Sequence, residues 1–126
     1  MFKGAQYVGN LMRAQPLVSY LLFTYKQEEF IKETVEAALE QTYSPLEIII
    51  SDDCSSDKTF KIIEEVVRSY KGPHQVITNR NGINLGIGAH VSSVLKRAKG
   101  EYIVLVGGDD ISSPDHVKLA VDVIQA

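Results

Sequence analysis

Two pairs of adjacent acidic residues are the side chains in this sequence that are best suited to chemistry. Asp52-Asp53 and Asp109-Asp110 each follow a short apolar run of the kind that forms a buried strand. In parallel α/β sheets, ligands bind beyond the carboxyl ends of the strands, so both pairs can face one crevice. Four carboxylates around one crevice repel one another unless a cation or a donor-rich ligand lies between them. The pattern therefore indicates a site for a hard cation such as Mg²⁺ or Mn²⁺, together with the phosphates of a substrate.

Small and polar residues accompany these pairs at the ends of the strands. Gly107-Gly108 precedes the second pair and lets a ligand approach the backbone closely. Thr24-Tyr25 ends the first strand and would form the floor of the crevice. A single Asp at a strand-to-helix turn more often caps the helix that follows, and we assign that role to Asp57 and Asp115. Two acidic pairs at equivalent strand ends favour a functional site instead.

The regions that position these residues alternate between apolar runs and helical periodicity. The expected strands cover 17–23, 46–50, 74–78 and 102–106. The first expected helix covers 27–41. The second follows an N-cap at Ser56 and ends before Gly72, and the third begins at residue 87 and ends before Gly100. The fourth follows an N-cap at Ser113. This order predicts an α/β fold, a Rossmann-like parallel sheet with helices on both faces and strand order 3-2-1-4. We expect Phe30 and Ile87 to lie on the apolar stripes of their helices, and Ile124 to belong to the buried stripe of the last helix.

The two ends of the sequence do not fit this alternation. Residues 1–16 show no clear period, so we interpret them as a leader or accessory segment before a domain over 17–126. The sequence stops directly after a helix, without a fifth strand. A doubly wound domain usually continues, so we expect a truncated sheet that is the front part of a longer protein.

The composition indicates one globular domain and excludes several classes of function. The 126 residues are enough for a single core, and 44% of them are hydrophobic. A net charge of −3 without a basic stripe gives no support for a nucleic-acid partner. The single cysteine, Cys54, excludes an intrachain disulfide. Because the sequence has neither a signal peptide nor an apolar run of ~20 residues, we predict no membrane span in this chain and a cytoplasmic location, with any membrane association through parts outside it.

Several short motifs occur in a fixed order along the chain. They are Thr24-Tyr25, Gln41-Thr42-Tyr43, the segment 47–57, Asn84-Leu85-Gly86, Gly100-Glu101-Tyr102-Ile103, and Gly108-Asp109-Asp110-Ile111 followed by Pro114. Each motif alone is weak evidence. The ordered set resembles the inverting family 2 glycosyltransferases of the GT-A fold, and it covers nearly everything from Leu17 onward.

The resemblance implies a role for individual residues. It implies that Thr24 and Tyr25 line a nucleotide pocket and that Asp53 contacts the base, commonly uracil. It implies that Asp109 is the metal ligand of an Asp-x-Asp motif and holds Mn²⁺ or Mg²⁺ against the donor diphosphate. The remaining expected substrate-binding residues are Gly86, Gly108 and Asp110.

The function implied is that of the donor half of a glycosyltransferase. It would bind a nucleotide-diphospho-sugar, most simply a UDP-sugar, for inverting transfer to the hydroxyl of an acceptor saccharide or lipid-linked saccharide in polysaccharide biosynthesis. The catalytic base is expected beyond Ala126, so we predict that the chain alone is inactive as a transferase.

The sequence departs from the family pattern at three places. Gly107 replaces the first Asp of Asp-x-Asp, which leaves Asp110 to compensate. Phe23 and Lys26 replace the proline and asparagine on either side of Thr24-Tyr25, and His90-Val91-Ser92 replaces Ala-Arg-Asn. Gly107, together with the second half of the domain that this sequence does not contain, makes a nucleotide-binding-only or inactive fragment the main competing hypothesis.

A signalling domain and a dinucleotide-binding domain have less support. A receiver-type signalling domain would need its acidic pair after the first strand, where Thr24-Tyr25 stands. The segment 86–91 is close to the dinucleotide fingerprint, but Val91 stands where that fingerprint needs Gly or Ala.

Overall fold

A computed structural model describes residues 15–126, and the predicted leader 1–16 lies almost entirely outside the described residues. Strands and helices alternate as the sequence predicts. The strands are β1 (Val18–Thr24), β2 (Leu46–Asp52), β3 (Gln75–Arg80) and β4 (Tyr102–Gly107). The helices are α2 (Ile31–Leu39), α3 (Thr59–Arg68), α4 (Ile87–Leu95) and α5 (His116–Ile124). Within residues 15–126, no helix is long and apolar enough to cross a bilayer.

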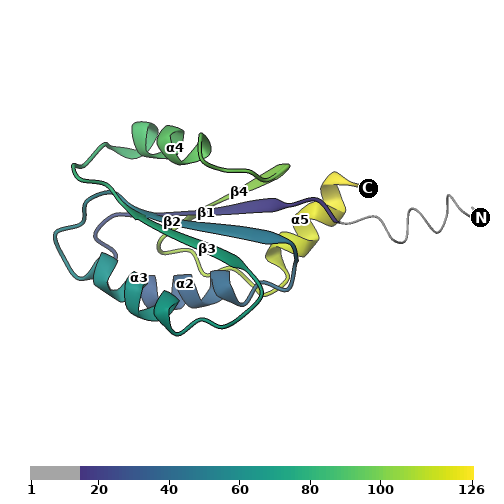
Figure 1. Cartoon of the computed structure of the whole chain (residues 1–126), viewed down its shortest axis with the longest axis horizontal. Helices are drawn as coiled ribbons and strands as arrows, with labels where there is room; N and C mark the ends of the chain where they lie inside the picture. Colours follow the sequence, from purple (N-terminus) through teal and green to yellow (C-terminus); the bar gives the residue numbers. More distant parts are fainter. Residues whose placement is uncertain (1–14) are drawn as a thin grey trace, which may run out of the picture.

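The four strands form one parallel sheet in the order β3-β2-β1-β4, which confirms the predicted order (Figure 1). The register places Leu22 of β1 opposite Ile50 of β2 and Val106 of β4. Helix α4 covers one face of the sheet, and α2 and α3 cover the other (Figure 1). The ends of β1, β2 and β4 therefore lie side by side at one edge of the sheet.

The hydrophobic core is larger on one face of the sheet than on the other. The larger cluster joins the sheet to α2, α3 and α5, and it includes Val35, Ile63 and Val121. The smaller cluster lies under α4 and consists of Leu21, Phe23, Ile49 and Val94. β1 and β2 are buried along their whole length, polar residues such as Glu47 included, as expected of strands in the middle of a parallel sheet.

Strand β4 differs because it lies at the edge of the sheet. Its residues alternate in burial, and the side chains of Ile103 and Leu105 are 42% and 56% exposed. Both are large apolar residues, so the described residues leave part of the face next to α4 uncovered.

Three predicted helix starts are wrong, and the first is that of α2, which begins at Ile31 and not at residue 27. Helix α3 begins at Thr59. The backbone N–H of Thr59 donates a hydrogen bond of 2.9 Å to Asp57 Oδ1, so Asp57 rather than Ser56 provides the acceptor for the first turn. Helix α5 begins at His116, whose N–H donates to the backbone carbonyl of Ser113. Ser56 and Ser113 therefore belong to the turns before these helices, where a local side-chain or backbone bond takes the place of a longer helix.

Predicted burials near helix ends are also wrong, and Ile124, expected to be buried, is 55% exposed at the end of α5. Phe30 is 51% exposed, and its neighbour Ile31 fills the core at the start of α2. Ile87 is 81% exposed at the first position of α4. Each of these residues lies at or just before an end of its helix, where helical spacing alone does not decide burial.

The amino end of β4 is joined to β1 and β2 by buried polar contacts. The carboxylate of Glu47 accepts hydrogen bonds from Ser19 Oγ (2.7 Å) and Lys99 N (3.0 Å). Gly100 N donates to the same Ser19 Oγ at 2.8 Å. A Cβ on Gly100 would lie 2.5 Å from the backbone nitrogen of Ser19, so only glycine fits this close approach.

Candidate functional site

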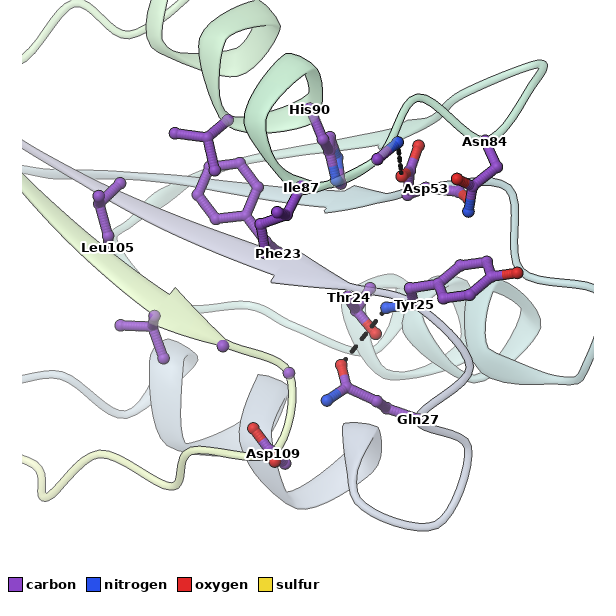
Figure 2. A pocket seen from close by; sticks show the side chains of 15 residues that line it. Phe23, Thr24, Tyr25, Gln27, Asp53, Asn84, Ile87, His90, Leu105 and Asp109 are labelled. Atoms are coloured by element: carbon purple, nitrogen blue, oxygen red, sulfur yellow. Dashed lines mark hydrogen bonds between the residues drawn. The ribbon is translucent and has the colours of Figure 1, made fainter.

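A cavity of about 560 Å³ opens at the carboxyl ends of β1, β2 and β4, beside the first turn of α4 (Figure 2). This is the edge at which an open α/β sheet binds ligands. Most of the predicted site residues line the cavity: Thr24, Tyr25, Asp53, Gly86, Gly108 and Asp109. Asp110 is not among its lining residues, and neither is Asp52.

Asp53 holds the loop that leads into α4. Its Oδ1 accepts hydrogen bonds from Asn81 Nδ2 (2.9 Å) and Leu85 N (2.8 Å), and its Oδ2 accepts one from Gly86 N (2.9 Å). Burial alone would raise the pKa of the Asp53 carboxyl, but these donors outweigh it and lower the pKa below its ordinary value. The Asp53 carboxylate is therefore ionised at neutral pH, and Oδ2 has room for one more donor.

The backbone conformation of Gly86 allows the loop to form these hydrogen bonds with Asp53. Its φ is +83°, a conformation that residues with a side chain rarely adopt, although a Cβ there would meet no atom within 4 Å. The requirement for glycine is therefore conformational. The turn directs Gly86 N at Asp53 and begins α4 at Ile87.

The carboxylate of Asp52 contacts other residues of the protein and does not face the cavity. Its carboxylate accepts hydrogen bonds from the backbone N–H and the hydroxyl of Ser55, and it lies 3.9 Å from Arg80 Nε. Ser55 Oγ in turn accepts a hydrogen bond of 2.8 Å from Lys26 N. Asp52 thus fixes the turns after β1 and β2 to each other, and only Asp53 of this pair faces the cavity.

The turn that follows β4 brings Asp109 to the cavity. A hydrogen bond of 3.0 Å from Asp110 N to the Gly107 carbonyl closes the turn, and Thr34 Oγ1 donates to the Gly108 carbonyl at 2.8 Å. A Cβ on Gly108 would collide with the side-chain oxygen of Gln27 and lie 2.8 Å from Thr24 Oγ1. Gly108 is therefore required so that the turn can lie against the end of β1.

His90 is a buried residue at the site whose role the sequence did not reveal. Its Nε2 lies 2.7 Å from Ser51 Oγ, and its ring meets the Phe23 ring edge to face with centroids 5.1 Å apart. Burial lowers the pKa of His90, although the charges of Asp53 and Asp52 partly oppose this. His90 is thus held neutral in the wall of the cavity. The signal in the sequence is a polar residue on the apolar stripe of a helix.

Gln27 is a second residue that sequence reasoning missed. It lines the cavity between Thr24 and the Gly108 turn (Figure 2). Thr24 Oγ1 itself is buried and has no hydrogen-bond partner among the described residues. The signal would have been a polar side chain shortly after a strand end that already carries two candidate residues.

The described residues provide few protein ligands for a metal ion. Within 15–126, no group of three or more His, Cys, Asp or Glu side chains is placed to hold one. Mg²⁺ and Mn²⁺ are often bound by one or two carboxylates plus substrate phosphates, and Asp109 at the cavity fits that kind of site.

Comparisons with known proteins agree with this geometry. The model of the family "Glycosyl transferase family 2" matches residues 19–126. The Escherichia coli UDP-Glc:alpha-D-GlcNAc-diphosphoundecaprenol beta-1,3-glucosyltransferase WfaP is 39% identical over 94 residues, covering 75% of this chain and 36% of that protein. This chain spans about a third of the length of most of the relatives that it matches.

Two solved structures have the same fold. S. aureus TarS 1–349 in complex with UDP aligns with a TM-score of 0.74 and 27% identity, over 86% of this chain and 32% of that one. The mannosyltransferase PcManGT from Pyrobaculum calidifontis, in complex with GDP-Man and Mn²⁺, aligns with a TM-score of 0.76 and 23% identity, over 88% and 32%. Both neighbours are GT-A glycosyltransferases, so the expected fold is confirmed. By its sequence and its fold, this chain belongs to glycosyl transferase family 2.

Proposed function

We propose that this chain forms the donor-binding part of a glycosyltransferase and binds a UDP-linked sugar together with Mn²⁺ or Mg²⁺. The observation that supports this most directly is the cavity at the ends of β1 and β4. There an exposed aromatic ring, an ionised buried carboxylate and an exposed acidic turn surround one space. A nucleotide diphosphate has a matching flat base, base N–H donors and charged phosphates.

Tyr25 and Asp53 are the residues that we assign to the base. The Tyr25 side chain is 43% exposed at the cavity, so one face of its ring is available for stacking. Asp53 Oδ2 accepts only one hydrogen bond within the described residues, from Gly86 N, and can accept another from the N–H of a pyrimidine. A uracil offers that donor at its N3 position, which favours a UDP donor.

Asp109 is the residue that we assign to the cation and the diphosphate. A divalent cation bound there would offset the negative charge that develops on the nucleotide diphosphate as it leaves. Asp109 has to reach the phosphates from a turn whose backbone is fixed by Thr34 and by Asp110. Gly86 and Gly108 let the donor approach the backbone, and Asp110 supports the acidic turn.

The catalytic base and the acceptor belong to our proposal for the whole protein. We place the catalytic base for an inverting attack by an acceptor hydroxyl beyond Ala126. The acceptor would be a saccharide or a lipid-linked saccharide. WfaP, by its name, acts on a diphosphoundecaprenol-linked sugar.

Calorimetric titration with UDP, with and without Mn²⁺, tests the proposed donor site. We expect Mn²⁺ to strengthen UDP binding to the chain. Asp109→Ala should remove that gain, and Asp122→Ala, an exposed carboxylate on α5, should retain it. If the wild type and Asp109→Ala bound UDP equally in the presence of Mn²⁺, the assignment of the site would be wrong.

Gly107 favours a second candidate function, in which the chain holds a nucleotide without supporting transfer. Glycine supplies no carboxylate at this position, so the cation would be held less strongly. Release of UDP from a labelled UDP-sugar by the complete protein, in the presence of saccharide acceptors, would separate the two functions. Binding without release of UDP would support the second.

A further inference from the structure

We infer that His90 is a positioning residue for the base of the nucleotide, and that it acts through the Asp53 carboxylate. A chain of hydrogen bonds joins the His90 ring to Asp53 Oδ1, and its three intermediate members are Ser51, Asn79 and Asn81. The inference rests on the proposed function, because it takes Asp53 Oδ2 as the acceptor for the base. Both His90 and Asp53 line the cavity (Figure 2).

Every step of the chain is a hydrogen bond between two side chains. Asn81 Nδ2 donates to Asp53 Oδ1 at 2.9 Å, and Asn79 Nδ2 donates to Asn81 Oδ1 at 3.1 Å. The same Asn79 nitrogen donates to Ser51 Oγ at 2.9 Å, and Ser51 Oγ lies 2.7 Å from His90 Nε2. The chain therefore joins α4 to β2 and β3 beside the cavity.

The charge on Asp53 sets the direction of every hydrogen bond in this chain. An ionised carboxylate only accepts, so Asn81 has to turn its amide NH₂ toward Asp53 and its amide oxygen toward Asn79. Asn79 then has to turn its own NH₂ toward Asn81 and Ser51. Because Ser51 Oγ accepts from Asn79, the hydroxyl hydrogen of Ser51 is left for His90 Nε2.

The His90 ring completes the chain in one protonation state, the neutral tautomer with its proton on Nδ1. Ser51 is 0% exposed, and its hydroxyl has no other acceptor among the described residues. A proton on His90 Nε2 would leave that buried hydroxyl hydrogen without a partner, which is rare in proteins. Burial lowers the pKa of His90, and the edge-to-face contact with Phe23 supports the position of the ring.

An asparagine amide can turn over, so the direction of the chain has to be fixed at both ends. Without an acceptor at residue 90, the Ser51 hydroxyl could donate to Asn79, whose amide would first have to turn its oxygen toward Ser51. The amide oxygens of Asn79 and Asn81 would then face each other, and relief of that repulsion would turn the Asn81 oxygen toward Asp53. His90 therefore keeps Oδ1 of Asp53 occupied by the chain and leaves Oδ2 for the base.

Heteronuclear NMR of the histidine rings at pH 7 tests the chain without any ligand, because it reads which ring nitrogen carries the proton. We expect His90 to be neutral with its proton on Nδ1, and the loss of one ring signal in His90→Gln assigns it. A proton on Nε2, in the neutral or the charged form, would overturn the inference.

Titration with uridine at pH 7, followed by the amide signals of the protein, tests the effect on the base. Uridine has no diphosphate, so its binding does not depend on the metal. His90→Leu removes the acceptor and should weaken uridine binding about fivefold. This is less than the tenfold loss that corresponds to about 1.4 kcal/mol, because Leu85 N and Gly86 N still bind the carboxylate. His90→Gln supplies an acceptor oxygen again and should recover most of the loss.

The outcomes distinguish this inference from the proposed function. His116→Leu, at an exposed position that does not line the cavity, is the matched control and should bind uridine as the wild type does. If UDP did not bind even with Mn²⁺, the proposed function would fail, and the ring protonation of His90 would still test the chain. If UDP bound with Mn²⁺ but uridine did not bind, only the inference would fail.

The two substitutions of His90 separate positioning from packing. Equal uridine binding by the wild type and His90→Leu would overturn the inference. Equal weakening in His90→Leu and His90→Gln would also overturn it, since His90 would then contribute only its packing. A loss in His90→Leu that His90→Gln largely recovers would support it.

Discussion

Replacing Asp53 with asparagine tests whether this carboxylate holds the loop from Asn81 to Gly86. The substitution keeps the size of the side chain and removes its charge. The amide oxygen can still accept from Asn81 Nδ2 and Leu85 N, the two donors that bind Oδ1 at 2.9 Å and 2.8 Å. The new amide NH₂ then faces Gly86 N, which loses its acceptor.

The loss of stability in Asp53→Asn follows from the three hydrogen bonds that the Asp53 carboxylate accepts. Hydrogen bonds to a charged group contribute about 1.5–3 kcal/mol and neutral ones about 1 kcal/mol, so each of the two retained bonds loses about 1 kcal/mol. The loss of the acceptor for Gly86 N–H adds about 1 kcal/mol to this cost. This value is at the low end of the range for an unpaired donor, because Gly86 is exposed and water can replace the acceptor. We therefore expect Asp53→Asn to lower the free energy of unfolding by about 3 kcal/mol at pH 7.

Urea unfolding followed by circular dichroism at pH 7 and pH 3 measures this loss. The pKa of Asp53 is lowered in the folded protein, so its contribution is complete above about pH 4 and is lost as the pH falls below that value. The gap between the wild type and Asp53→Asn should therefore narrow at pH 3. Asp122→Asn, which removes the same charge from an exposed pair with Lys118, should cost less than about 0.5 kcal/mol. A gap below about 0.5 kcal/mol at pH 7, or one of equal size at both pH values, would refute the reasoning.

Two further predictions concern positions away from that loop. Gly100→Ala places a Cβ 2.5 Å from the backbone nitrogen of Ser19 and should cost about 3 kcal/mol in urea unfolding, whereas Gly82→Ala meets nothing within 4 Å and should change stability by less than about 0.5 kcal/mol. Equal costs for the two alanines would contradict the close approach of β4 to β1. Burial lowers the pKa of His90 below 6.5, so the wild type should lose stability as the pH falls from about 6.5 toward 5. His90→Gln should flatten that part of the pH profile, and an unchanged slope would show that His90 is not held neutral.

The sequence was sufficient to predict the order of the strands. Short runs rich in apolar residues, such as Leu17 to Phe23, are typical of strands buried on both faces, and their alternation with helical segments leaves few topologies. The family assignment follows from the motifs and leaves no place for a receiver-type signalling domain. Helix ends were predicted less well, since Ser56 and Ser113 are good capping residues that the chain uses in turns instead.

The candidate site was predictable in part. The position of Thr24, Tyr25 and Asp109 at the ends of β1 and β4 follows from the strand order alone. The internal use of Asp52 did not follow, because a carboxylate that binds a ligand and one that binds its own loop have the same sequence signature. Gln27 was missed for a similar reason. Its importance depends on a Gly108 turn that comes much later in the chain and meets it only in the folded protein.

The pairing of β1 with β4 has a consequence for synthesis of the protein. About 80 residues separate the paired strands, so a ribosome that adds roughly 5–20 residues per second completes β4 roughly 4–16 s after β1. During that interval one side of β1 has unpaired N–H and C=O groups, which can pair with another strand. The cavity has walls from both strands, so it is also incomplete at this stage. The Gly100–Ser19 hydrogen bond can form only when β4 joins β1, so it forms together with the wall that β4 gives the cavity.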